Sequence, residues 1–110
     1  MLDPTLLLSI LTRTHALIAK GWCQGDYAQF ADGTEAFVDN PEACRWSLIG
    51  ALHVVLRKDS QSDLLPQVNG YLHRFLPTGI NYAEDYSDLP TTTQADVLVL
   101  LERAMAGVGK

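Results

Sequence analysis

The sequence predicts a mainly α-helical α+β fold: a compact four-helix domain with one short β-hairpin between the first and second helices. Four stretches carry apolar residues at helical spacing, which is the main sign of helices that bury one face. Between the first two stretches, residues 22–39 lose this spacing and are rich in strand-forming side chains. The length of 110 residues fits one domain, so we expect residues 1–110 to form a single globular domain.

The first helix is predicted over residues 4–20. Asp3 is a favourable N-cap residue, and Pro4 suits the first helical position. Lys20 suits the negative end of the helix dipole, and Gly21 suits the left-handed position just past the helix end. The residues at helical spacing on the expected buried face are Leu6, Leu7, Ile10, Leu11, Thr14, Leu17 and Ile18.

Residues 22–39 are predicted to form a short hairpin or an ordered loop with strand-like arms. Asp32-Gly33 is a turn dipeptide of the kind that joins two antiparallel strands. The strand-forming residues around it are Trp22, Tyr27, Phe30, Phe37 and Val38.

A second helix is predicted from Asn40-Pro41-Glu42, which repeats the cap, proline and acid of a helix start, to about residue 58. Its apolar residues surround almost the whole circumference, so we expect the other three helices to surround it and the hairpin to cap it. Gly50 lowers helix stability by about 1 kcal/mol relative to alanine, so we expect another element to approach closely there. His53 is expected to be buried and bonded to a backbone carbonyl.

A third helix is predicted after the polar break at residues 60–63. Pro66 lies in its first turn, where proline is tolerated, and the helix ends near Pro77. Residues 78–90 are predicted to form a loop, and its expected anchors in the core are Ile80, Tyr82 and Tyr86.

The last helix is predicted from the pair Thr93 and Asp96 to about residue 106. The two residues have the spacing of a capping box, with aspartate in place of the usual glutamate. Gly107 and Gly109 end this helix.

The net charge of -5 is unevenly distributed. Five acidic residues and no Lys or Arg lie between Gly21 and Cys44, and the stretch between Phe75 and Glu102 also lacks both basic types. A surface of this sign repels a phosphate backbone, so we expect no direct nucleic-acid partner. A basic protein partner, a cation or a cationic ligand is compatible with it, and so is a solvated face that aids solubility.

Several features favour a cytoplasmic protein with reduced thiols and no membrane partner. No apolar stretch is long enough to cross a bilayer, and the run Leu6-Leu7-Leu8 lacks the basic flank of a signal peptide. Cys23 and Cys44 form neither a disulfide framework nor a zinc signature.

No residue pattern identifies a cofactor, a metal site or a catalytic residue, and we expect none of them. The phosphate-binding patterns Gly-x-x-x-x-Gly-Lys and Gly-x-Gly-x-x-Gly are absent, and the three histidines lie on different predicted helices. A thiol-dependent enzyme that uses Cys23 or Cys44 stays open as an alternative. His53 could act as its base only if the hairpin folded back on the second helix.

The candidate binding surface combines two loops that each follow a helix, the turn at residues 22–25 and the loop at residues 80–85. Aromatic rings beside amide and carboxylate groups suit a pocket or the rim of a protein interface. The same mixture suits two loops that stabilise each other. The candidate ligand- or partner-binding residues are Trp22, Gln24, Asp26, Tyr27, Asn81, Tyr82, Glu84 and Asp85.

Short motifs along the chain carry a resemblance. They are Trp22-Cys23-Gln24-Gly25, Asp32-Gly33, Cys44-Arg45-Trp46-Ser47-Leu48-Ile49-Gly50-Ala51-Leu52, Glu84-Asp85, and Asp96-Val97-Leu98 through Arg103-Ala104. From Leu6 to Ala106 the chain resembles a small family of bacterial and bacteriophage proteins known only as a domain of unknown function. Members show a Trp-x-Gln-Gly turn, a Trp-Cys-x-x-Gly-Ala-Leu helix and a Trp-Asn-Asp loop. Ser47 replaces the Cys, and Ala83-Glu84-Asp85 replaces Trp-Asn-Asp, which weakens a catalytic interpretation.

The leading functional hypothesis is a non-catalytic binding or regulatory module. The resemblance implies a phage or prophage accessory protein, which we expect to engage a host protein through its acidic surface. One alternative is a small-ligand binder, for a nucleotide or a metabolite, that uses residues 22–25 and 80–85. The thiol-dependent enzyme is the other. A symmetric homodimer through apolar area on the first or last helix also stays open.

Overall fold

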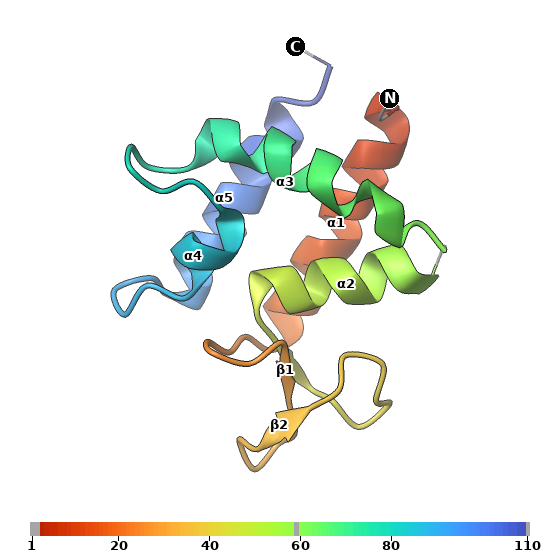
Figure 1. Ribbon diagram of the computed structural model, residues 1–110, viewed down its shortest axis with the longest axis vertical. Coiled ribbons are helices and arrows are strands. Elements are labelled where there is room, and N and C mark those ends of the chain that lie inside the picture. The colour runs from red at the N-terminus through yellow and green to blue at the C-terminus, as the bar shows by residue number, and fades with distance from the viewer. Residues whose placement is uncertain (1–2, 59, 110) are drawn as a thin grey trace.

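The first and last helices of the chain pack side by side, and three further helices lie in front of them in Figure 1. The computed structural model describes residues 3–58 and 60–109. The α-helices are α1 (Pro4–Lys20), α2 (Leu48–Lys58), α3 (Leu65–Leu72), α4 (Ala83–Ser87) and α5 (Gln94–Ala106). The strands are β1 (Ala28–Gln29), β2 (Glu35–Ala36) and β3 (Arg45–Trp46), and the short 3-10 segments are η1 (Ser62–Leu64) and η2 (His73–Phe75).

The predicted start of α1 is confirmed. The Asp3 carboxylate accepts a hydrogen bond of 2.8 Å from the backbone N–H of Thr5, and Pro4 occupies the first turn. The prediction for Gly21 is wrong, because its φ is -178° and its backbone is extended rather than left-handed. A Cβ atom at this position would collide with the carbonyl oxygen of Cys44, so the glycine permits close approach of two segments.

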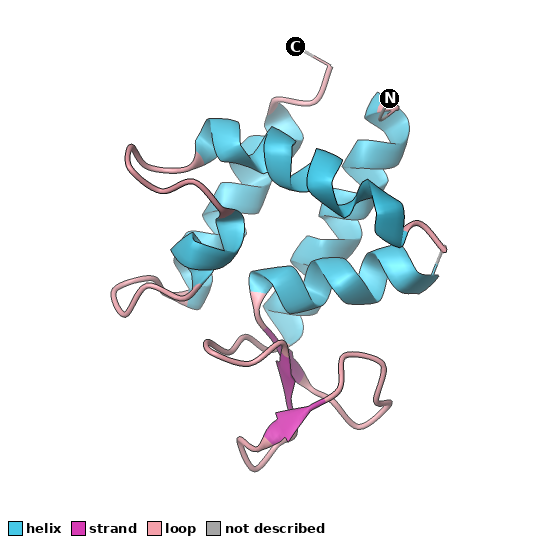
Figure 2. Ribbon diagram, viewed as in Figure 1, coloured by secondary structure: helices cyan, strands magenta, loops and turns pink. Residues whose placement is uncertain are grey.

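The segment between α1 and α2 forms a small sheet that projects from the helical body (Figure 2). β1 lies at the centre and pairs antiparallel with both β2 and β3, in the order β2-β1-β3. The sequence interpretation foresaw one two-stranded hairpin and missed the third strand. The turn between β1 and β2 contains Asp32, whose carboxylate accepts a hydrogen bond of 3.0 Å from the N–H of Thr34.

The predicted start of the second helix is wrong. Asn40 caps only a local turn, in which its side-chain oxygen accepts a hydrogen bond of 2.8 Å from the N–H of Glu42. Arg45 and Trp46 then pair with β1, and α2 begins only at Leu48. Its actual cap is the Ser47 hydroxyl, which accepts a hydrogen bond of 3.1 Å from the N–H of Gly50.

The close approach predicted at Gly50 is confirmed. A Cβ atom there would collide with the backbone carbonyl of Tyr27, just before β1. α2 is nevertheless not wrapped on all sides, since His53 and Val54 are half-buried and Arg57 is exposed. The predicted hydrogen bond from His53 to a backbone carbonyl is not among the contacts of the described residues.

The described residues contain five α-helices rather than the predicted four, because part of the expected loop at residues 78–90 forms α4. Ala83 in α4 is buried, so this helix packs against α2. Tyr82 is 62% exposed and is not a core anchor, whereas Ile80 and Tyr86 are half-buried. The sequence pattern of residues 83–87 is only weakly helical. The extra helix forms because burial of one short apolar face against the rest of the protein stabilises it.

The predictions for α3 and α5 are confirmed. Pro66 lies in the first turn of α3, and Thr93 and Asp96 form a complete capping box at the start of α5. The protein has a radius of gyration of 13.0 Å and is compact. Over residues 3–58 and 60–109, no helix has both the length and the apolarity to span a bilayer.

Candidate functional site

Gln24, one of the candidate binding residues, holds the segment that joins α4 to α5. Its amide nitrogen lies 2.9 Å from the carbonyl oxygen of Ser87, 2.6 Å from that of Leu89 and 3.3 Å from that of Thr92. An amide NH2 group has two protons, so these three acceptors use its full donor capacity. The side-chain nitrogen of Gln24 is therefore occupied by the fold itself.

The neighbouring residues reinforce this connection. The N–H of Gly25 donates a hydrogen bond of 3.1 Å to the carboxylate of Asp88, and Gly25 has the positive φ of 85° that suits glycine. Asp26 accepts a hydrogen bond of 3.0 Å from the side chain of Gln29. The turn at residues 22–25 is thus tied to residues 87–92, and none of its hydrogen bonds among the described residues reaches 80–85.

Trp22 serves the packing of the sheet against α1. Its backbone forms a parallel bridge with Trp46, in which the N–H of Trp46 donates to Gly21 and the N–H of Cys23 donates to Trp46. The Trp22 ring is half-buried against the core. Its indole nitrogen is buried and has no hydrogen-bond partner in the described part of the chain.

Tyr27 contacts His53, a residue outside the predicted site, and the charge of Glu84 acts on the same imidazole. The rings of Tyr27 and His53 are stacked, with centroids 5.3 Å apart and planes 20° apart. Burial lowers the pKa of His53, and Arg57 lowers it further, whereas Glu84 acts in the opposite direction. The imidazole is therefore favoured in its neutral form by its surroundings.

Asn81 and Tyr82 border a groove over α3, while Asp85 is exposed on α4. The groove has a volume of 500 Å³ and is also lined by Asn69 and Gly70. The structure therefore divides seven of the eight candidate residues among three places: the tied turn, the surroundings of His53 and the α3 groove. Asp85 lies apart from all three, exposed on α4.

The most exposed large apolar side chain in the described chain belongs to Phe37, which is 83% exposed directly after β2. The preceding Ala36 is buried, as the alternation of side chains along a strand requires. Sequence reasoning treated Phe37 as a strand former and did not include it in the candidate site. The sequence feature that could have indicated an exposed Phe37 is its position within the stretch of acidic residues between Gly21 and Cys44.

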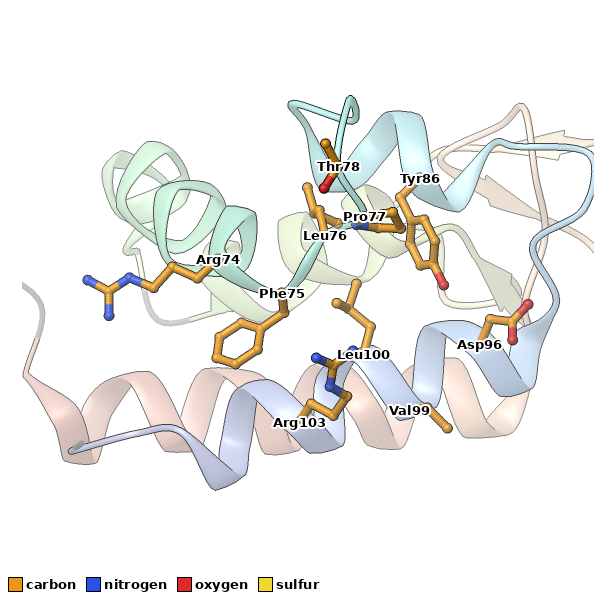
Figure 3. A pocket seen from close by; sticks show the side chains of 10 residues that line it. All are labelled: Arg74, Phe75, Leu76, Pro77, Thr78, Tyr86, Asp96, Val99, Leu100 and Arg103. Carbon is orange, nitrogen blue, oxygen red and sulfur yellow. The ribbon is translucent and has the colours of Figure 1, made fainter.

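A second pocket, of 360 Å³, lies between α5 and the chain that follows η2 (Figure 3). Two arginines line it, and Figure 3 shows Arg74 pointing away from its centre. Arg74 lies over the ring of Tyr71 at 5.4 Å, and Asp96 accepts a hydrogen bond of 2.9 Å from Thr93 in the capping box. Apart from Arg103, the charged groups of this pocket thus have structural partners.

The two cysteines are free, and Cys23 is buried. Burial raises the pKa of the Cys23 thiol to about 11, and the nearby carboxylates of Asp26 and Asp88 contribute in the same direction. A thiol with this pKa is a poor nucleophile at neutral pH. Within residues 3–58 and 60–109, no group of three or more His, Cys, Asp or Glu side chains could hold a metal ion.

A family model described as a family of unknown function, DUF6197, matches residues 3–107. The chain belongs to this family. No curated protein and no solved structure matches the chain. The DUF6197 description names no activity.

Proposed function

We propose that this DUF6197 protein is a non-catalytic binding module that engages a basic protein partner through its acidic sheet lobe, residues 26–42. The observation that carries the proposal is the 83% exposure of Phe37 within residues 26–42, a stretch that contains no Lys or Arg. The basic residue of the sheet, Arg45 in β3, donates a hydrogen bond of 3.4 Å to the carbonyl oxygen of Ala31. Exposed aromatic side chains are frequent energetic anchors of protein interfaces. A monomer gains no stability from leaving such a ring in water.

The charges around Phe37 suit a cationic partner. Asp39 lies 3.4 Å from Arg57, so its charge is partly balanced within the protein. Glu35 and Glu42 are exposed, and the contacts of the described residues include no ion pair to either. These two carboxylates are free to attract Lys or Arg side chains and to speed association.

The backbone of the lobe offers a further point of attachment. β2 lies at the edge of the sheet and pairs only with β1. An edge strand leaves N–H and C=O groups that an extended peptide can pair with. The partner segment is therefore a basic, extended one with an apolar contact for Phe37.

We also propose a cellular compartment and an origin for the protein. We place it in the cytoplasm, which keeps thiols reduced, because Cys23 and Cys44 are free. We further propose a phage or prophage accessory protein that engages a host factor and does not bind nucleic acid directly. A phage or defence locus around the gene would support this origin, and a conserved housekeeping operon would contradict it.

Binding to a peptide array tests the partner chemistry. The array pairs Lys- and Arg-rich extended peptides with copies in which Glu replaces each basic residue. We expect binding to the basic set, weakening as salt screens the charges. Phe37→Ala should lower affinity about 30-fold, the effect of losing a 2 kcal/mol anchor. Leu8→Ala is the matched control, because Leu8 is 42% exposed on α1, outside the lobe. Equal binding by the two variants, or no preference for basic peptides, would contradict the proposal.

A further inference from the structure

We propose that the pocket between α5 and the chain that follows η2 binds a small monocarboxylate with an apolar body, whose carboxylate group pairs with Arg103. This site is separate from the acidic sheet lobe and does not depend on it. The pocket has a volume of 360 Å³, within the range of about 300–1,000 Å³ that is usual for small-molecule pockets. Its charged lining residues are Arg74, Asp96 and Arg103.

Arg103 supplies a positive charge to this pocket. Figure 3 shows its side chain rising from α5 toward the chain that follows η2. Among residues 3–58 and 60–109 its guanidinium takes part in no ion pair, and the adjacent Glu102 lies 2.9 Å from His15 instead. In a chain of net charge -5, a guanidinium without a carboxylate partner favours a negatively charged ligand in this pocket. Its planar fork can hold both oxygens of a carboxylate.

The other two charged groups of the pocket have partners within the protein. The guanidinium of Arg74 lies over the ring of Tyr71 at 5.4 Å and points away from the pocket centre in Figure 3. Asp96 accepts a hydrogen bond of 2.9 Å from the N–H of Thr93 in the capping box. It precedes Arg103 by two turns of α5, which is about 10 Å along the helix axis. Asp96 would therefore repel a second carboxylate at that end, and the favoured ligand carries only one.

Tyr86 supplies an uncharged hydrogen-bond donor. Figure 3 shows its hydroxyl directed toward α5, and this hydroxyl makes no hydrogen bond to another residue in the described part of the chain. Burial raises the pKa of Tyr86, Asp96 raises it further, and Arg103 lowers it. The phenol therefore stays protonated at neutral pH and can donate to a ligand oxygen.

The rest of the lining is mainly apolar. Pro77 is exposed, and Phe75 and Leu76 are half-buried, so these side chains keep apolar surface that a ligand can cover. This surface is the reason to assign an acid with an apolar body rather than a small inorganic anion. The residues that complete the lining are Thr78, Val99 and Leu100.

Calorimetric titration of the full chain with phenylpropanoate and phenylpropanamide tests the assignment. The amide keeps the shape of the acid and removes its charge. We expect saturable binding of the acid and about tenfold lower affinity for the amide, because hydrogen bonds between charged groups are the stronger ones. An acetylated tripeptide that ends in phenylalanine separates a free acid from the C-terminus of a protein, and we expect it to bind no more tightly than the acid. Equal affinities for acid and amide, no saturable binding of the acid, or tighter binding of the tripeptide would overturn the proposal.

The two arginines of the pocket give a matched pair of variants. Arg103→Gln should lower the affinity for phenylpropanoate about tenfold and remove the preference for the acid over the amide. The far-ultraviolet circular dichroism should stay that of a folded protein. Arg103→Lys should bind with intermediate affinity, since lysine keeps the charge but loses the planar fork. Arg74→Gln is the control, because Arg74 lines the same pocket but points away from its centre. Its affinity should stay within about twofold of wild type, since solvent and salt screen the lost charge.

Two outcomes with these variants would overturn the site. One is folded Arg103→Gln protein with wild-type affinity for phenylpropanoate, and the other is an equal loss of affinity in Arg74→Gln and Arg103→Gln. Phe37→Ala should leave phenylpropanoate binding unaltered, so failure of the lobe proposal is distinguishable.

Discussion

The side-chain amide of Gln24 connects the end of α1 to the turn before α5. Its nitrogen faces the carbonyl oxygens of Ser87, Leu89 and Thr92. The Ser87 hydroxyl in turn accepts a hydrogen bond of 3.3 Å from the N–H of Leu48, at the start of α2. Three segments far apart in the sequence thus meet through two polar side chains, and at this scale the residues serve the fold.

Replacement of Gln24 tests this structural role. Gln24→Ala should lower the free energy of unfolding by about 1–3 kcal/mol, since the three carbonyl groups lose a part-buried donor. Gln24→Glu should lower it further, because a carboxylate cannot donate and lies near Asp88. Urea denaturation measures both changes, with Gln67→Glu on the exposed side of α3 as control. Wild-type stability of Gln24→Glu would contradict the assignment.

Alkylation rates test the buried state of Cys23. Its thiol donates a hydrogen bond of 3.5 Å to the carbonyl of Asp26, and burial raises its pKa to about 11. At pH 8 we expect iodoacetamide to label Cys23 far more slowly in the native protein than in denaturant. The half-buried Cys44 provides an internal comparison. Rapid labelling of native Cys23 would restore the thiol-dependent enzyme as a candidate.

At the scale of the elements, helix starts that depend on local chemistry were predictable, and a start that depends on distant pairing was not. Asp3 caps α1 and Thr93 caps α5 by bonds within a few residues. Asn40 offers the same local chemistry, yet the chain continues to β3, because Arg45 and Trp46 pair with β1. Side-chain pairing and burial in a sheet override a local helix signal.

Two helical glycines make a matched pair for testing this packing. Gly50→Ala should lower the free energy of unfolding by about 1–3 kcal/mol, because the methyl group meets the backbone of Tyr27. Gly70→Ala should raise it by up to about 1 kcal/mol, since the methyl group enters open space and favours the helix. Thermal unfolding would measure both. Equal effects at the two positions would contradict the close approach of α2 and the sheet.

The contact between α2 and the sheet also predicts a dependence on pH. The pKa of His53 is lowered by burial and by Arg57, against the influence of Glu84. Because protonation is easier in the unfolded chain, the stability that neutral His53 contributes is present above about pH 6.5 and is lost as pH falls below it. Unfolding measured from pH 7 to 5 should show a smaller loss in His53→Phe, which keeps a ring on Tyr27. His73→Phe, on exposed η2, is the control, and identical profiles for His53→Phe and wild type would contradict the argument.

At the scale of the whole molecule, a helical body carries a small acidic lobe on one side (Figure 2). The acidic character of the lobe could be predicted from the sequence, because the number of acidic and basic residues in a segment is the same however the chain folds. The exposure of Phe37 and the open space over Gly70 were not, since both depend on what other segments leave uncovered. For the same reason the sequence could not predict that the candidate residues lie in different places. Gln24 donates to the backbone carbonyl of Leu89, Tyr27 stacks on His53, and Tyr82 borders the α3 groove.

The central claim is that the acidic sheet lobe is the surface that binds a basic partner. Nuclear magnetic resonance titration tests this claim most directly. Isotope-labelled protein would be titrated with the tightest basic peptide from the array, and the shifted backbone signals would be mapped. The account predicts the largest changes within residues 26–42, centred on Phe37, and their loss in Phe37→Ala. Changes centred on α3 or α5, with the lobe signals unmoved, would contradict it.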